Sequence, residues 1–266
     1  MAIVEPLNHE LLTVDLCCDL GEGFGAYTLA DDAALLDVVT SANIACGFHA
    51  GDPNTMAASV EYAARRGVSI GAHPGYRDLV GFGRRRIEMS TEEVTSDILY
   101  QLGALNAFLR RHNQTLQHIT PHGALGNSAT TDPDCARGII EAVDAFDPDL
   151  TIVTGDGELA RLARGGGFRV AMMFLADRAY TEELQPVRRK LTGSVLTDAD
   201  EVARRVVRAV TQHTVVASTG VEVPVHVDTV LIHGDTPNSG HLALAIREAL
   251  SRAKVAIEPM ATTLRR

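Results

Sequence analysis

Cysteine, basic runs and long apolar segments are all scarce in this sequence of 266 residues. Its four cysteines include no CxxC pair and no spacing typical of a disulfide framework or a zinc ribbon, which favours a reducing compartment. No stretch approaches the roughly 20 apolar residues that a membrane-spanning helix needs. Residues 1–12 lack the basic start and apolar core of a signal peptide. We therefore expect a cytoplasmic protein with no membrane partner.

The charge balance argues against nucleic acid as a partner. The sequence has 24 lysines and arginines against 34 aspartates and glutamates, for a formal net charge of −10. Such a chain lacks the basic patch that binds a phosphate backbone or an anionic membrane. Several familiar signatures are also missing, namely GxxxxGK[ST], GxSxG, HExxH, and a GxGxxG between a strand and a helix. A nucleotide, if one is used, is bound by something other than a standard loop.

Short apolar runs alternate with longer amphipathic segments, which is the pattern of βα units around a parallel sheet. The expected strands are residues 11–16, 41–46, 68–72, 116–120, 150–153, 169–174 and 229–232. The expected helices are residues 31–38, 53–66, 90–111, 134–143, a short one from 158, 198–212 and 241–252, with an irregular segment at 184–196 and a hairpin at 214–227. We predict one (β/α) barrel domain of seven strands over residues 1–266, with residues 1–10 a flexible tail.

Four of the expected strands end in a histidine that is flanked by glycine, alanine or proline. The segments are IACGFHAGD with His49, IGAHPG with His73, ITPHGA with His122, and LIHGD with His233. Because the strands of a parallel barrel end at the face that holds the active site, we expect these four imidazoles to converge there. The adjoining glycines would let a substrate approach the backbone and let the chain turn sharply.

A single histidine at a strand end is more often a hydrogen-bonded structural residue than a catalyst. Four of them favour a function, because packing gives no reason to place titratable groups repeatedly at one end. Asp52 and Asp235 follow two of the histidines, and the first strand adds Asp15 and Asp19. A carboxylate beside a neutral imidazole can fix its tautomer and raise its basicity, as the activation of water requires. The other histidines are interpreted as structural or solvated: His9, His112, His118, His213, His226 and His241.

Two expected loops contain arginine. Residues 81–86 include Arg84, and Asp177 and Arg178 precede Tyr180. Such arginines could clamp a carboxylate or phosphate, and they could equally be solvated surface charges. The four cysteines have no basic setting and are interpreted as small core residues rather than nucleophiles.

These residues lie in blocks that resemble the LamB/YcsF family of 5-oxoprolinase subunits. The blocks DLxCDLGEGFGAY, SANIACGFHAGDP, GAHPGYRDLVGFGRR, YQLGAL, PHGAL, ADRAY and HGD occur in the family's order, and the resemblance extends from Asp15 to Leu250. The resemblance implies a TIM-like barrel of the glycoside hydrolase/deacetylase type. It also implies, together with two partner subunits, opening of the lactam 5-oxo-L-proline to L-glutamate, with ATP as co-substrate.

By this resemblance, the histidines and aspartates described above surround the substrate. The implied catalytic residues are Asp15, Asp19, His49, Asp52, His73, His122, His233 and Asp235. The residues expected to bind the substrate are Arg84, Asp177, Arg178 and Arg189, the last at the family's arginine position. Phosphorylating the lactam oxygen would create a better leaving group, after which imidazoles and carboxylates would move protons. The preferred general base is His49 or His73, paired with a carboxylate.

The chain departs from the family pattern at several positions. Cysteine replaces asparagine at Cys17, threonine replaces lysine at Thr120, glycine replaces tyrosine at Gly126, methionine replaces glutamate at Met173, and leucine replaces glycine at Leu184. If the missing groups bind ATP or stabilise developing charge, losing one could cost about 2.7 to 4 kcal/mol of transition-state stabilisation. The missing lysine and glutamate could instead form one ion pair, in which case losing both is less harmful than losing either.

Three functions remain in competition. The first is an active 5-oxoprolinase subunit. The second is a metal-dependent amide hydrolase or deacetylase, because histidine and aspartate are good ligands for zinc and related divalent ions. The third is a binding subunit of the same complex that keeps the pocket but has lost turnover, as Thr120 and Met173 suggest. Neither the metal dependence nor the oligomeric state is fixed by the sequence, and a homo-oligomer is compatible with it.

Overall fold

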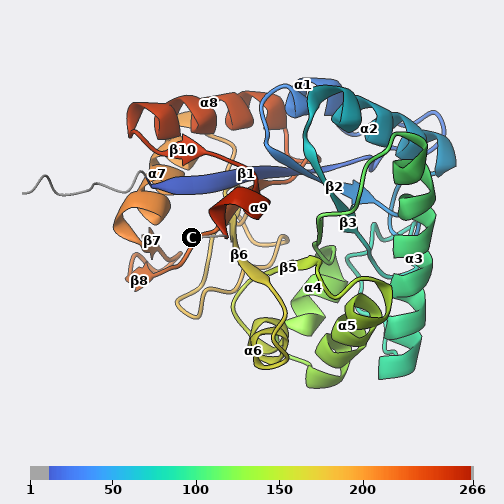
Figure 1. The fold of residues 1–266 in the computed structure, drawn as a ribbon. Coiled ribbons are helices and arrows are strands. Elements are labelled where there is room, and N and C mark those ends of the chain that lie inside the picture. The colour runs from blue at the N-terminus through green and yellow to red at the C-terminus, as the bar shows by residue number, and fades with distance from the viewer. Residues whose placement is uncertain (1–11, 265–266) are drawn as a thin grey trace, which may run out of the picture.

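The computed structural model describes residues 12–264, which form a closed barrel of parallel strands inside a ring of helices (Figure 1). The barrel strands are β1 (Thr13–Leu20), β2 (Ser41–Ala45), β3 (Ser69–His73), β4 (His118–Ile119), β5 (Thr151–Thr154), β6 (Val170–Leu175) and β9 (Thr229–Ile232). Strand β9 pairs with both β6 and β1, so that the sheet closes on itself. The prediction of a seven-stranded (β/α) barrel is confirmed.

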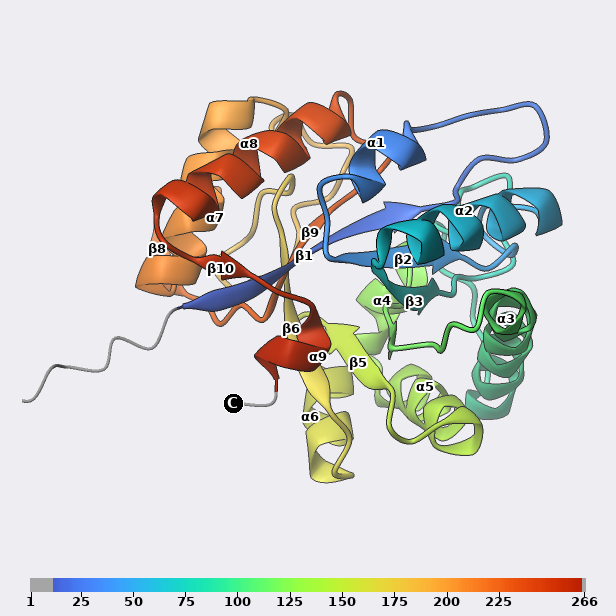
Figure 2. The same ribbon diagram turned by 45° about the horizontal axis from the view of Figure 1, so that its top comes forward.

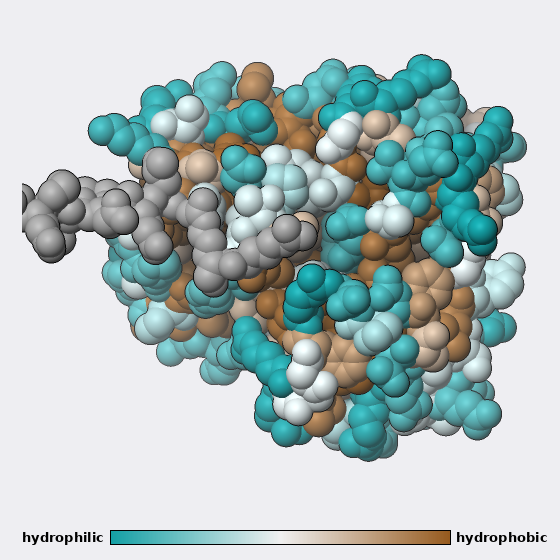
Figure 3. Space-filling model, in the orientation of Figure 1, coloured by the Kyte–Doolittle hydropathy of each residue, from teal (hydrophilic) through white to brown (hydrophobic). Residues whose placement is uncertain are grey.

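Helices pack around the outside of the barrel. They are α1 (Asp32–Leu36), α2 (Pro53–Arg66), α3 (Thr91–Arg111), α4 (Gly123–Ala129), α5 (Pro133–Phe146), α6 (Glu158–Gly165), α7 (Ala199–Gln212) and α8 (Ser239–Arg252). Two views place α3 beside α5 and α7 beside α8 (Figures 1 and 2). The face in Figure 3 is largely hydrophilic around its rim, with hydrophobic side chains visible between the polar ones.

Local sequence signals set the ends of two long helices. Helix α2 begins after Asp52, whose carboxylate accepts hydrogen bonds from the backbone N–H groups of Asn54 and Thr55. Helix α3 opens with the capping box that Ser90 and Glu93 predict. These side chains satisfy backbone donors that a first helical turn leaves unpaired. Asp52 therefore has a structural task at the start of α2.

Some element bounds differ from the expected ones where polar or small residues obscure the pattern. Strand β1 runs to Leu20 rather than residue 16, and β4 has only two residues. Helix α4 is absent from the sequence expectation because Gly123 and Gly126 lower the helix propensity of this short segment. The end of the described chain adds β10 (Ala256–Ile257), which pairs with β1, and α9 (Met260–Thr263).

The expected hairpin at residues 214–227 is present. Strand β7 (Thr214–Val216) pairs antiparallel with β8 (Glu222–Pro224). No helix within residues 12–264 is both long and apolar enough to cross a membrane. The flexible tail predicted for residues 1–10 lies outside the described residues, and the assignment of the whole chain to one domain stays a prediction.

Strand β1 separates an apolar layer from a polar barrel interior. Leu16, Cys18 and Leu20 belong to the buried hydrophobic core under the helices. Asp15 and Asp19 alternate with these residues and therefore point to the other side of the strand. Four residues of extended chain place these two carboxyl groups about 13 Å apart along the barrel. The interior is thus polar at both levels of β1.

Candidate active site

Three histidines gather at the carboxyl ends of β2, β3 and β4. His73 is the last residue of β3, and His49 and His122 lie just beyond the ends of β2 and β4. The rings of His49 and His122 stack with centroids 3.8 Å apart, and the His73 ring meets them edge-on at 5.3 and 4.8 Å. All three side chains are buried. The structure thus brings together three of the four predicted imidazoles.

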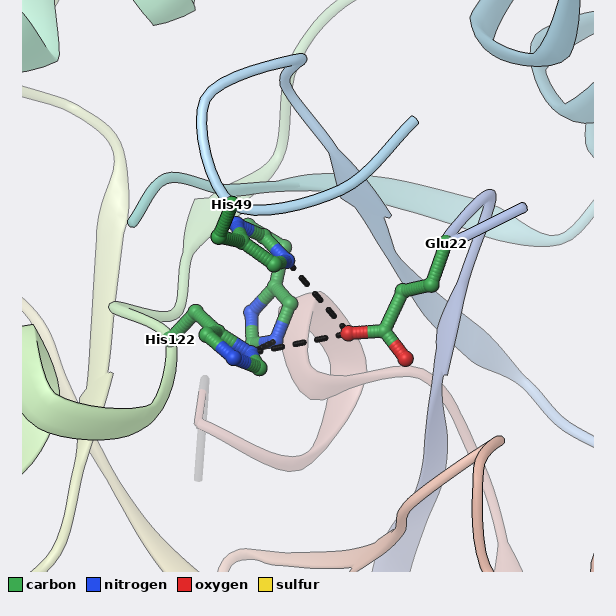
Figure 4. A group of neighbouring side chains, drawn as sticks. Glu22, His49 and His122 are labelled. Atoms are coloured by element: carbon green, nitrogen blue, oxygen red, sulfur yellow. Dashed lines mark hydrogen bonds and ion pairs between the residues drawn. The ribbon is translucent and has the colours of Figure 1, made fainter. Parts of the chain in front are cut away.

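A carboxylate outside the predicted set joins these rings. Glu22 Oε1 lies 3.3 Å from His49 Nε2 and 3.5 Å from His122 Nδ1, with the carboxylate directed toward both rings (Figure 4). Burial, followed by the charge of Asp19, raises the pKa of Glu22 well above its ordinary value. The sequence signal for this residue is its position three places after Asp19, just beyond β1. Glu22 and the three histidines, called the Glu–His cluster below, could together hold a metal ion.

Two backbone carbonyl groups fix the tautomers of two rings in this cluster. His73 Nδ1 lies 2.7 Å from the Thr120 oxygen, and His122 Nε2 lies 2.9 Å from the Phe82 oxygen. Because a carbonyl oxygen only accepts, both of these nitrogens carry hydrogen and donate. The other two nitrogens, His73 Nε2 and His122 Nδ1, face each other at 2.9 Å. Burial lowers the pKa of both rings, which favours their neutral forms.

Glycines near these histidines leave room for the rings. A Cβ atom at Gly75 would lie 2.6 Å from His49 Nδ1, and one at Gly83 would lie 2.6 Å from His49 Cβ and 2.7 Å from His122 Cδ2. Phe82 adopts a left-handed φ of 54° and directs its carbonyl oxygen to His122. The sequence interpretation gave glycines such as Gly75 to substrate access, whereas here they allow the close packing of imidazoles.

The fourth predicted histidine, His233, forms a pair with Asp177. Its Nδ1 donates to Asp177 Oδ1 at 2.8 Å, and the hydroxyl of Thr236 donates to the other carboxylate oxygen. Burial alone would raise the pKa of Asp177, but His233 and these hydrogen bonds hold it below its ordinary value. Asp177 was expected to bind substrate, and the structure places it fully buried behind His233. The pair orients His233 so that Nε2 is available for proton transfer.

A cavity of about 1100 Å³ lies beside these groups. Its lining includes His73, His122, His233, Arg84, Arg178 and Arg189. Arg84 Nη2 contacts Asp235 Oδ2 at 2.6 Å, and Arg189 Nη2 lies 3.6 Å from Asp235 Oδ1. Burial would raise the pKa of Asp235, and the two guanidinium groups lower it overall. Positive charge at this wall suits a carboxylate or phosphate group.

Other predicted residues have different partners. Arg178 donates to the backbone oxygens of Ser194 and Val187, so that it ties the irregular 184–196 segment to the barrel. Asp15 lies near the amino-terminal ends of the strands, where it accepts hydrogen bonds from the hydroxyl groups of Ser41 and Thr229 at 2.6 Å. The structure does not bring Asp15 or the helix cap Asp52 into the Glu–His cluster.

An amide side chain links Asp19 to positions 118 and 120. Asn43 Nδ2 donates to Asp19 Oδ1 at 2.9 Å, and its Oδ1 accepts hydrogen bonds from His118 Nε2 and the Thr120 hydroxyl at 2.8 and 2.9 Å. His118 thus has a structural partner inside the barrel, as interpreted from the sequence. Asn43 is missing from the predicted set, because a lone asparagine in an apolar strand carries no signal of its own.

The substituted positions are concentrated at the cavity. Thr120, Gly126, Met173 and Leu184 all line it. Leu184 adopts a φ of 57°, the left-handed region in which glycine is favoured. The cysteines lie apart from this chemistry, because burial raises the pKa of Cys46 to about 12 and of Cys135 to about 11.

A (β/α) barrel with imidazoles and carboxylates gathered at the carboxyl ends of its strands has the layout of a barrel enzyme. The model of the LamB/YcsF family matches residues 14–265, and the chain belongs to this family. An A-type 5-oxoprolinase subunit from Nitrobacter hamburgensis is 46% identical over 253 residues, covering 94% of this chain and 99% of that protein. The A-type 5-oxoprolinase subunit from Thermus thermophilus is 46% identical over 247 residues, covering 92% and 99%.

Solved structures agree with this assignment. The crystal structure of a lactam utilization protein from Thermus thermophilus has a TM-score of 0.87 and 45% identity, and covers 92% of this chain and 99% of that one. A putative cellobiose-phosphate cleavage protein from Enterococcus faecalis has a TM-score of 0.54 at 12% identity, covering 95% and 98%, and shares the fold alone.

Proposed function

We propose that this chain is one component of an ATP-dependent 5-oxoprolinase, which hydrolyses 5-oxo-L-proline to L-glutamate with two partner subunits. The observation that carries the proposal is the single cavity in which His73, His122 and His233 face the arginines Arg84 and Arg189. Relatives named as A-type 5-oxoprolinase subunits, at 44 to 46% identity over nearly their whole length, support it. Four buried cysteines without disulfide partners support a reducing compartment such as the cytoplasm.

The proposed reaction begins with activation of an unreactive amide. Transfer of a phosphoryl group from ATP to the lactam oxygen releases ADP and makes the ring carbon more electrophilic. Water then adds to this carbon, the C–N bond breaks, and the nitrogen takes up a proton to become the amino group of γ-glutamyl phosphate. A second water releases phosphate and leaves L-glutamate, so that two waters and one ATP are consumed for each ring opened.

The cavity offers groups for each proton transfer. His73 lies 3.5 Å from Asp19 and faces the cavity, so it is placed to accept a proton from the attacking water. His233, held by Asp177, is placed to donate a proton to the departing ring nitrogen. Arg84 is close enough to the cavity to hold the substrate carboxylate through charge-assisted hydrogen bonds.

The test is reconstitution of the complete assembly. The purified chain, mixed with its two partner subunits, ATP and 5-oxo-L-proline, should release L-glutamate and ADP, whereas His73→Ala should not. His241→Gln, on the exposed side of α8, is the matched control and should keep the rate of the natural protein. Glutamate formation no greater than that of His73→Ala would overturn the proposal.

A second candidate is a binding subunit of the same complex that has lost turnover. It is favoured by Thr120 and Met173, which place an uncharged hydroxyl and a thioether on the cavity wall where the family pattern has a cation and an anion. Calorimetric binding of 5-oxo-L-proline by the assembly without turnover would favour this candidate. Robust glutamate release would end it.

A further inference from the structure

The hydrogen bonds of the Glu–His cluster leave two lone pairs directed at each other. His73 Nδ1 and His122 Nε2 both donate to backbone carbonyl oxygens. In neutral rings the remaining nitrogens, His73 Nε2 and His122 Nδ1, carry no hydrogen, yet they lie 2.9 Å apart. Two acceptors at this distance repel each other unless a positive species binds them. That species is either an additional proton or a metal ion.

The surrounding charges favour a divalent ion. Glu22 lies beside His49 and His122, and Asp19 Oδ2 lies 3.5 Å from His73 Nε2. Within residues 12–264, neither carboxylate has a lysine or arginine nitrogen within salt-bridge distance. One additional proton could compensate only one of these two buried charges, and burying an uncompensated carboxylate is costly. A divalent cation compensates both.

The spacing of the candidate ligand atoms matches a compact coordination shell. One atom from each of the four side chains lies within 4.8 Å of the others. The Glu22 oxygen lies 3.3 and 3.5 Å from its two nitrogen neighbours, and the two facing nitrogens are 2.9 Å apart. Metal–ligand bonds of 2.0 to 2.2 Å in a tetrahedral site imply ligand separations of about 3.3 to 3.6 Å. Small side-chain shifts would therefore complete the site.

We propose that the Glu–His cluster binds one divalent first-row transition-metal ion of the zinc class. The ligand atoms are Glu22 Oε1, His49 Nε2, His73 Nε2 and His122 Nδ1. Three imidazole nitrogens and one carboxylate oxygen suit such an ion better than Mg²⁺ or Ca²⁺, which prefer oxygen ligands. The carbonyl oxygens of Thr120 and Phe82 hold two of the rings in the required tautomers, as partners of metal-bound histidines commonly do.

The inference deepens the proposed function, because His73 and His122 belong to the wall of the substrate cavity. A bound ion there would polarise a substrate oxygen or lower the pKa of a water molecule. It nevertheless makes a claim about the chain alone. Metal binding can be measured without partner subunits, ATP or 5-oxo-L-proline.

The test uses the full-length chain after treatment with a chelator. Titration with Zn²⁺ by calorimetry should give one bound equivalent, and titration with Co²⁺ should develop the visible absorption of a tetrahedral nitrogen and oxygen site. Glu22→Gln and His122→Ala should each weaken Zn²⁺ binding by about a hundredfold or more, beyond the 10- to 100-fold typical of losing an outer partner. His241→Gln should still bind one equivalent.

Thermal unfolding of the metal-free variants keeps the test interpretable. Glu22→Gln preserves the shape of the side chain and is expected to unfold close to the natural protein, so its loss of binding reports on the ligand. Failure of the natural chain to bind either ion stoichiometrically, or unchanged binding by a folded Glu22→Gln, would overturn the inference and point to a shared proton. A chain that binds Zn²⁺ but yields no glutamate in the full assembly would sink the proposed function and leave the metal site standing.

Discussion

The two ends of the barrel treat the same residue type in opposite ways, as Asp15 and Asp19 of β1 illustrate. Asp15 accepts hydrogen bonds from three hydroxyl groups, those of Thr40, Ser41 and Thr229. Asp19, four residues along the same strand, receives one amide hydrogen bond and otherwise lies near an imidazole. Hydroxyl partners fix a carboxylate in place, whereas an imidazole can exchange protons with it.

Other groups extend this contrast. At the carboxyl end of the strands, His49 Nδ1 and Asp235 Oδ1 are buried without a hydrogen-bond partner among the described residues. Two loop residues there, Phe82 and Leu184, adopt left-handed backbone conformations. Unsatisfied polar atoms and backbone strain persist where the surrounding structure enforces them, commonly at functional sites. The comparison assigns stability to the Asp15 level and chemistry to the Asp19 level.

The largest expected effect is that of Asp19→Asn on turnover. The amide keeps the oxygen that accepts from Asn43 but removes the charge beside His73, so proton transfer should suffer while folding does not. We expect kcat of the reconstituted assembly to fall by about 10² to 10⁴, with a much smaller change in KM. Thermal unfolding should be nearly unchanged. A variant that loses stability and keeps kcat would reverse the roles assigned to the two aspartates.

Asp15→Asn should act on stability and its pH dependence. Burial raises the pKa of Asp15 from 3.8 to about 6, so the folded state holds a proton that the unfolded state releases. This contribution to stability is fully present below about pH 3.8 and is lost as the pH rises through about 6. It amounts to about 3 kcal/mol.

The measurement is urea unfolding of the natural protein and Asp15→Asn at pH 4 and pH 7.5. The stability of the natural protein relative to the variant should fall by about 3 kcal/mol between these values. Asp52→Asn is a control of opposite sign, because hydrogen bonds from Gly25 and Thr55 lower the pKa of Asp52. Its carboxylate contributes stability that is lost as the pH falls. A pH-independent difference for Asp15→Asn would contradict the assignment.

The pair Thr120→Lys and Met173→Glu probes the substituted cavity wall. Thr120 is fully buried, so a lysine there alone would bury an unpaired charge and break the hydrogen bond to Asn43. If the two family residues form an ion pair, the double variant should be more stable than the sum of the single effects predicts, by about 2 kcal/mol. A double-mutant cycle of unfolding free energies measures this coupling. Strict additivity would exclude the ion pair.

Much of the fold follows from local signals in the sequence. Apolar runs of strand length, the cap at Asp52 and the capping box at Ser90 locate most of the strands and helices. The histidines at the strand ends are found because parallel topology brings those ends to one face. Strand length is less predictable, since a polar residue such as Asp19 can belong to a strand when a partner across the barrel binds it.

The missing members of the site depend on contacts between distant segments. Glu22 gains its place from the loop after β1, which folds its carboxylate against rings that are 27 and 100 residues away. Asp15 and Asp19 look equivalent in the sequence, and only their different neighbours across the barrel distinguish them. Local patterns locate the face of the barrel that holds the site, whereas the partner of each side chain is decided by the register of the strands and the paths of the loops.

The smallest expected effect concerns the strain at Leu184. Glycine normally destabilises a protein relative to alanine, because it loses more backbone entropy on folding. At a φ of 57° this order should reverse, since the left-handed conformation costs a residue with a Cβ atom about 1 to 2 kcal/mol. Both Leu184→Gly and Leu184→Ala lose the packing of the leucine side chain against the core, so their difference isolates the backbone effect. Leu184→Gly should be more stable than Leu184→Ala by about 1 kcal/mol in urea unfolding, and the opposite order would remove the strain from the carboxyl end of the barrel.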